Sequence, residues 1–104
     1  MTYKFIAHIK RWFDKYNGNS YFSVRIFDMN DKLISVNFDL NTNIIYGYGS
    51  HPEFETIKFL KNTYPRCYEN IDLEKLHNHD IRKMIYFNDD TGCKKSEVKE
   101  WGTN

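Results

Sequence analysis

The chain has 104 residues, of which 40% are hydrophobic and 28% are charged. This composition excludes an intrinsically disordered protein and predicts one folded domain over residues 1–104. The formal net charge of +1 excludes a protein that binds nucleic acid through a high overall positive charge. Aromatic residues make up 17% of the chain, so some rings must stay partly exposed on so small a domain.

The sequence also bears on the cellular compartment. Cys67 and Cys93 are too few and too far apart to indicate a disulfide framework. The N-terminal residues lack the apolar run of a signal peptide, and no segment approaches the roughly 20 apolar residues that span a membrane. We therefore expect a cytoplasmic protein with reduced thiols and no membrane contact.

The N-terminal part of the chain predicts three antiparallel strands. Residues 3–13 alternate between two sets of side chains, as a half-buried strand does. Asn17-Gly18-Asn19 favours a hairpin turn, and residues 20–28 continue as the second strand. After a turn at residues 29–31, residues 33–40 complete this meander. The side chains expected to face the core are Tyr3, Phe5, Ala7, Ile9, Phe13, Phe22, Val24, Ile26, Ile34, Val36, Phe38 and Leu40.

A helix is predicted over residues 51–63, after residues 44–48 either extend the sheet or form an irregular edge. Ser50-x-x-Glu53 has the pattern of a capping box, in which each side chain satisfies a backbone N–H of the other residue. Pro52 suits the first turn of a helix because its missing N–H costs nothing there. The apolar stripe expected to pack across the meander is Phe54, Ile57, Leu60 and Tyr64, with Phe59 off the stripe.

The C-terminal forty residues predict shorter elements. Residues 73–76 indicate one helical turn, residues 81–87 a strand and residues 90–92 a turn. Residues 93–101 are expected to pair back as an exposed, charge-rich strand. The predicted fold class is therefore α+β: a three-stranded antiparallel meander packed by one helix, with a C-terminal strand or hairpin.

The first hairpin and the turn before the helix carry recognisable motifs. The residues concerned are Trp12-Phe13-Asp14-Lys15, Asn17-Gly18-Asn19-Ser20-Tyr21, Ser23-Val24 and Tyr46-Gly47-Tyr48-Gly49. Over residues 3–64 the chain resembles a group of small bacteriophage proteins with a W-F-D-K/R-x-N-G-N-S/T-Y hairpin and a Y-G-Y-G turn. Ser20 and Phe22 replace a Thr and a His of that pattern. The resemblance implies phage origin and the order of meander and helix, but no catalytic residues.

The outward face of the predicted sheet is the preferred candidate for a binding site. Strand alternation places cations and aromatic rings there, and the hairpin brings Trp12 roughly opposite residues 21–23. This mixture suits stacked bases and phosphates, or an aromatic and arginine hot spot for a protein partner. The alternative is that a C-terminal hairpin covers this face as a second core layer. The candidate binding residues are His8, Lys10, Trp12, Tyr21, Arg25 and Phe27.

Residues 46–53 allow two interpretations. Gly47, Tyr48, Gly49 and Ser50 could form an anion-binding turn at the start of the predicted helix. A phosphate loop normally brings a Lys or Arg, which this segment lacks, and Glu53 has the wrong charge for a phosphate site. We therefore favour a tight turn from strand to helix.

The other residues that could carry chemistry predict no site. Four residues are of the types that bind zinc, but they lack the close-paired spacing of structural zinc sites. They are Cys67, His77, His79 and Cys93. Residues 77–80 match the letters of a metal-dependent nuclease motif, without the hairpin and helix that such a site needs. Asp89 and Asp90 precede Thr91-Gly92, as is common in turns. We expect no catalytic residue, no metal ligand and no cofactor.

On these grounds we expect a small phage-encoded binding protein without enzymatic activity. Its partner would be a host protein or nucleoprotein, an anti-phage defence protein included, in the cytoplasm of the infected bacterium. The first alternative is direct binding of nucleic acid. The second is a nucleotide-binding protein or a metal-dependent nuclease that uses residues 46–53 or 77–80. An uncovered edge strand would favour a homodimer.

Overall fold

The computed structural model describes residues 3–63 and 73–103. In chain order the elements are β1 (Phe5–Asp14), β2 (Asn19–Asp28), β3 (Leu33–Val36), the 3-10 turn η1 (Asn37–Asp39), β4 (Ile45–Tyr46), α1 (His51–Thr63), the 3-10 turn η2 (Leu73–Lys75), α2 (Asn78–Lys83), β5 (Ile85–Asp90) and α3 (Lys95–Trp101). No helix in the described ranges is long and apolar enough to cross a membrane.

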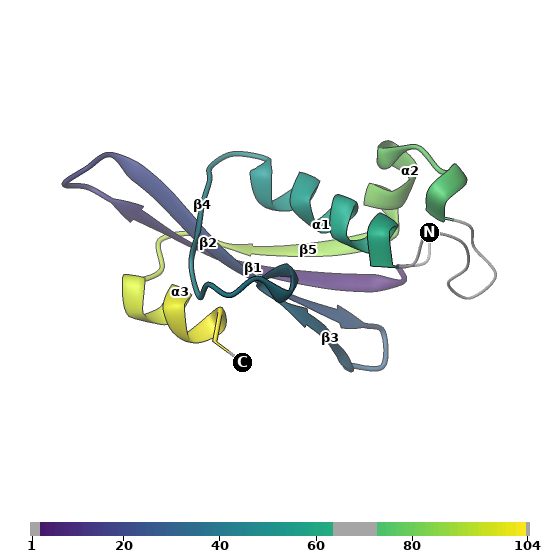
Figure 1. Ribbon diagram of the computed structural model, residues 1–104, viewed down its shortest axis with the longest axis horizontal. Helices are drawn as coiled ribbons and strands as arrows, with labels where there is room; N and C mark the ends of the chain where they lie inside the picture. The colour runs from purple at the N-terminus through teal and green to yellow at the C-terminus, as the bar shows by residue number, and fades with distance from the viewer. Residues whose placement is uncertain (1–2, 64–72, 104) are drawn as a thin grey trace.

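The strands form one five-stranded mixed sheet with α-helices on both sides (Figure 1). The order is β3-β2-β1-β5, and β4 also pairs with β2. The β1–β2, β2–β3 and β2–β4 pairs are antiparallel, whereas β5 runs parallel to β1. The α+β class is confirmed. The expected detail, a three-stranded meander packed by one helix with a C-terminal strand or hairpin, is not confirmed, since the described ranges hold five strands in one mixed sheet and three α-helices.

One face of the sheet carries the main apolar core. Side chains that alternate along β1 and β2 point toward α1, and most of them are fully buried. The alternation therefore identified this face correctly for the central residues. Tyr3 and Phe13, also expected in the core, are 39% and 53% exposed, so their placement was wrong. The buried core residues are Phe5, Ala7, Ile9, Phe22, Val24, Ile26, Ile57, Leu60, Leu73, Ile81 and Ile85.

The third strand is shorter than predicted, because the chain leaves the sheet after Val36. Asn37, Phe38 and Asp39 have positive φ angles of 48°, 58° and 61°, which places them in the left-handed region. The fully buried Asn37 side chain explains the change. Its Oδ1 accepts a hydrogen bond from the Val24 N–H at 2.8 Å, and its Nδ2 donates one to the Thr42 carbonyl at 3.0 Å. The Asn37 side-chain amide thus takes the place of a backbone hydrogen-bond partner from a neighbouring strand.

Two residues of the predicted third strand also face differently from the expectation. Val36 lies opposite Arg25 and is therefore on the side of the sheet away from the main core. Leu40 is 55% exposed, so its placement in the core was wrong. Phe38 does reach the core, where its ring centroid lies 5.9 Å from that of Phe59.

Helix α1 occupies the predicted residues, but its apolar stripe is shifted. Phe54, expected in the core, is 59% exposed, and Phe59, expected off the stripe, packs against the core. Tyr64 lies outside the described residues. The carboxylate of Glu53, expected to close a capping box with Ser50, instead accepts hydrogen bonds from Arg82 of α2 at 3.1 and 3.2 Å.

The C-terminal region differs most from the expectation. Residues 78–83 form α2, and the strand begins only at Ile85 and pairs with β1 instead of forming a hairpin. Residues 95–101, expected as a strand, form α3, which packs on the opposite face of the sheet from α1 (Figure 1). The Glu97 carboxylate accepts a hydrogen bond from the Lys94 N–H at 2.9 Å, which caps the first turn.

Candidate functional site

The sheet register brings the six predicted binding residues onto one face. Direct pairing joins His8 to Arg25 and Trp12 to Tyr21, and Phe27 lies opposite Ile6. Lys10 is opposite Ser23. All six side chains are partly buried. The burial of each side chain depends on the element that covers it. The covering element differs between the middle of the face and its hairpin end.

Helix α3 covers the middle of this face through Trp101. The Trp101 indole N–H donates a hydrogen bond of 2.8 Å to the His8 carbonyl, and the two rings meet edge to face at 4.8 Å. The Arg25 guanidinium carbon lies 4.3 Å from the Trp101 ring centroid, and the Lys10 ammonium lies 5.1 Å from it. These cations therefore make cation–π contacts within the protein.

Arg25 also holds the end of α3. Its Nε donates to the Trp101 carbonyl at 2.8 Å, and an Nη donates to the Thr103 carbonyl at 3.0 Å. The last carbonyls of a helix lack partners within the helix, and a cation near them is favourable. This part of the sheet face is thus covered by a helix, and not by the C-terminal hairpin that was considered as the alternative.

Burial under α3 changes the acid–base behaviour of His8. Desolvation lowers the pKa of His8 below its ordinary value, and the neighbouring Lys10 lowers it further, while Asp90 acts in the opposite direction. The neutral imidazole is therefore favoured in the folded protein.

The hairpin end of the same face lies beyond α3 and carries three aromatic rings in series. Trp12 and Tyr21 stack with their centroids 5.4 Å apart and their planes at 23°. Tyr46 of β4 meets Tyr21 edge to face at 5.6 Å and is 57% exposed. We call Trp12, Tyr21 and Tyr46 the aromatic ladder. The Lys95 ammonium lies 5.3 Å from the Trp12 ring centroid and adds a cation beside it.

A groove of about 460 Å³ lies next to the ladder, between the tip of the β1–β2 hairpin and the start of α3. Figure 1 shows this hairpin extending past the neighbouring elements. We call the concavity the hairpin groove. Phe13 is 53% exposed and Tyr16 is 99% exposed beside it. The side chains that line it include those of Trp12, Phe13, Lys15, Tyr16, Lys94 and Lys95.

The glycine-containing turn before α1 has a packing explanation. A Cβ at the buried Gly47 would lie 2.7 Å from the Phe22 ring and 3.0 Å from the His51 ring. Gly49 has a φ angle of 62°, which favours glycine. Ser50 and the 70% exposed Tyr48 lie at the surface of this turn. Both glycines are thus needed by the turn, whether or not an anion binds there.

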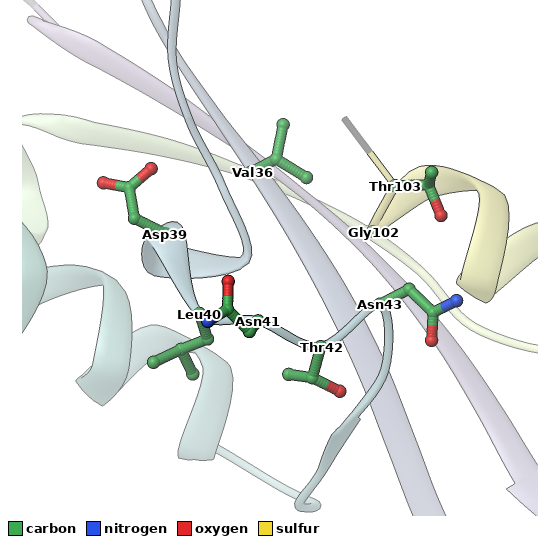
Figure 2. A pocket seen from close by; sticks show the side chains of 8 residues that line it. All are labelled: Val36, Asp39, Leu40, Asn41, Thr42, Asn43, Gly102 and Thr103. Atoms are coloured by element: carbon green, nitrogen blue, oxygen red, sulfur yellow. The ribbon is translucent and has the colours of Figure 1, made fainter.

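A second cavity, of about 630 Å³, lies between the loop after β3 and the end of α3. Figure 2 shows its lining side chains, which include Asp39, Thr42 and Asn43. These polar groups point in different directions and do not converge on one point. Convergent polar groups are what a small-molecule site needs, so this cavity offers no defined ligand chemistry.

Two of the remaining candidate residues, Asp89 and Cys93, have hydrogen-bond partners in the protein. Both carboxylate oxygens of Asp89 accept hydrogen bonds from Arg11, at 2.8 and 2.7 Å. The thiol of Cys93 donates to the Asp90 carbonyl at 3.4 Å, and burial raises its pKa. The segment 77–80 starts α2, and Cys67 lies outside the described residues. Within residues 3–63 and 73–103, no three His, Cys, Asp or Glu side chains group as metal ligands would.

Sequence reasoning missed three contributors to this surface: Tyr46, Lys95 and Trp101. Tyr46 lies in the segment 44–48, for which an extension of the sheet was one expectation, but it was not assigned to the binding face. Val98 and Trp101 are three residues apart, which is the spacing of a one-sided helix and was the available signal for α3. Comparisons with protein family models, with curated proteins and with solved structures found no match to this chain.

Proposed function

We propose that this chain is a phage-encoded binding protein without enzymatic activity, which inhibits a host protein or nucleoprotein. A host anti-phage defence protein is the partner class we favour. The proposed contact surface is the aromatic ladder, instead of the whole sheet face. The middle of that face is unsuited to a partner because Trp101 occupies it.

The observation that carries this proposal is the packed series of rings at an open end of the sheet. Trp12 and Tyr21 are held in a stack before any partner arrives, so binding loses little side-chain entropy there. Tyrosine and tryptophan dominate protein-binding hot spots because they offer large contact areas with few rotatable bonds. Tyr46 presents more than half of its surface to solvent without a core role.

The test is an affinity capture from lysate of a bacterial host, with and without nuclease treatment. A protein band that survives nuclease is expected for the wild type. Tyr46→Ala should weaken capture by about 2 kcal/mol, roughly thirtyfold, because an anchor ring is lost. Tyr86→Ala is the matched control, since Tyr86 is 51% exposed on β5, at a different position in the sheet. Equal capture by both variants would contradict the proposal.

Direct binding of nucleic acid is the second candidate function. The observation that favours it is the presence of Lys15, Lys94 and Lys95 at the groove beside the ladder. Lysines paired with exposed rings are typical of single-strand-binding surfaces. In that case nuclease should remove every captured partner, and affinity for an oligonucleotide should fall steeply with salt because counterions are released on binding.

A further inference from the structure

We propose that the hairpin groove binds an acidic peptide segment of the partner protein, anchored by an apolar side chain. This inference rests on the proposed function and names the chemistry of the partner. It shares Trp12 with the aromatic ladder and adds three lysines and the Phe13 ring that the ladder does not include.

The charge of the groove favours an anionic occupant. Lys15, Lys94 and Lys95 line it together with a single carboxylate, that of Asp14. This carboxylate accepts hydrogen bonds within its own turn, from the Tyr16 N–H at 3.0 Å and the Asn17 side chain at 2.8 Å, and it also interacts electrostatically with Lys95. The remaining charge of the wall is positive, so carboxylates of a partner would be attracted to it.

The apolar part of the groove favours a hydrophobic anchor. Phe13 is 53% exposed although it lies on a strand, and Trp12 forms the adjoining wall. The groove volume of about 460 Å³ lies within the range of pockets that enclose small molecules or a few side chains. A leucine or phenylalanine placed there would bury apolar surface of both partners.

The state of the Trp12 ring favours a peptide over a nucleic acid. Tyr21 stacks on it at 5.4 Å, and the Lys95 ammonium lies 5.3 Å from its centroid. Base binding by single-strand-binding proteins uses aromatic faces that are open to stacking. Because Trp12 already has these neighbours, its role in the groove is to form an apolar wall for a side chain.

The experiment is a selection of random dodecapeptides displayed on phage, with the full-length protein immobilised. The expected result is enrichment of peptides that combine Asp or Glu with Leu, Phe or Trp. A chemically synthesised enriched peptide should then bind the Lys94→Glu/Lys95→Glu protein at least tenfold more weakly than the wild type. Lys32→Glu/Lys58→Glu, which makes the same charge change at two exposed lysines outside the groove, should bind it equally well.

A second variant separates the apolar part of the proposal from the charge. Phe13→Ser alters an exposed side chain and should also weaken peptide binding at least tenfold while the fold is retained, as checked by circular dichroism. Selected peptides without acidic enrichment, or no enrichment at all, would overturn the inference. Tighter binding of a thymidine oligonucleotide through the same lysines would replace it with nucleic-acid recognition.

The two proposals fail in distinguishable ways. If Tyr46→Ala abolishes capture of a host protein but Lys94→Glu/Lys95→Glu does not, the proposed function stands and the groove assignment fails. If acidic peptides bind the groove but no host protein is captured, the groove assignment stands and the proposed function fails.

Discussion

The two faces of the sheet are stabilised by different kinds of interaction. The α1 face buries aliphatic and phenyl side chains from β1, β2 and α1, as Val24 and Leu60 illustrate for the aliphatic ones. The α3 face instead depends on Trp101, which is held by hydrogen bonds and by cations over its ring. Burial is non-directional and is shared among many residues, whereas the contacts of Trp101 are directional and few. Damage to the α1 face should therefore affect the whole fold, and damage to the α3 face mainly the docking of one helix.

The largest effect is expected at the centre of the α1 face. Phe22→Ala removes a fully buried ring and leaves a cavity, so the free energy of unfolding should fall by about 3–5 kcal/mol. Urea denaturation followed by circular dichroism measures this change. The matched control is Phe54→Ala on α1, where the ring is 59% exposed and the cost should stay near about 0.5 kcal/mol. A similar loss of unfolding free energy in both variants would contradict the assignment of the main core to the α1 face.

A smaller effect is expected where α3 ends. A Cβ at the buried Gly102 would overlap the Asn43 carbonyl oxygen and the Asn37 side-chain nitrogen. Gly102→Ala should therefore cost about 1–3 kcal/mol, the usual penalty of overpacking. Amide hydrogen exchange should show loss of protection in α3 before the strands. The exposed Ser96→Ala on the same helix is the control, and loss of protection there would point to general fraying of α3.

The hydrogen bond of Trp101 can be removed without removing its ring. Trp101→Phe keeps an aromatic side chain near Arg25 but loses the N–H that donates to the His8 carbonyl. The expected cost is about 0.5–1.5 kcal/mol, the net value of one hydrogen bond. Thermal unfolding measured by calorimetry would detect it. An unchanged melting temperature would show that the cations and packing alone hold α3 on the sheet.

The smallest expected effect concerns pH. Desolvation lowers the pKa of His8 in the folded protein, so in the interval between the folded and unfolded pKa values the unfolded chain binds more protons than the folded one. This contribution to stability is present above the unfolded value of about 6.5 and is lost as pH falls through the folded pKa. His8→Gln should flatten the wild-type dependence of unfolding free energy on pH in the interval just below the ordinary histidine pKa of 6.5. An identical slope in both proteins would contradict a desolvated, neutral His8.

The strongly patterned half of the fold was predictable from the sequence. Alternation, interrupted only at Arg11 on the core side of the first strand, identified β1 and β2, and the Ser50-x-x-Glu53 pattern with helical spacing identified the bounds of α1. The end of β3 was not predictable, because it depends on the buried Asn37 amide bonding to Val24 of a neighbouring strand. The period of the sequence pattern predicts which side of a strand is apolar. It does not predict that one side chain, here the Asn37 amide, takes the place of a backbone hydrogen-bond partner.

The candidate site was predictable only in part. Alternation and hairpin pairing brought Trp12 opposite Tyr21, as the register confirms. Neither pattern could predict that α3 would cover Arg25, since α3 has only Val98 and Trp101 as apolar anchors. Lys95 reaches the Trp12 ring from the far end of the chain, and local sequence carries no information on such a contact.

The parallel pairing of β1 with β5 has a consequence for how the chain reaches its native state. Phe5 pairs with Ile85, so the second edge of β1 is satisfied only by a segment that is distant in the sequence. The α3-side face of β1 depends on a segment that is more distant still, because Trp101 follows β5. Contacts this distant in sequence slow folding, because the loop-closure entropy must be lost before they form. A β1–β2 hairpin that forms before β5 is available therefore has an unpaired edge on β1 until residues 85–90 join the sheet.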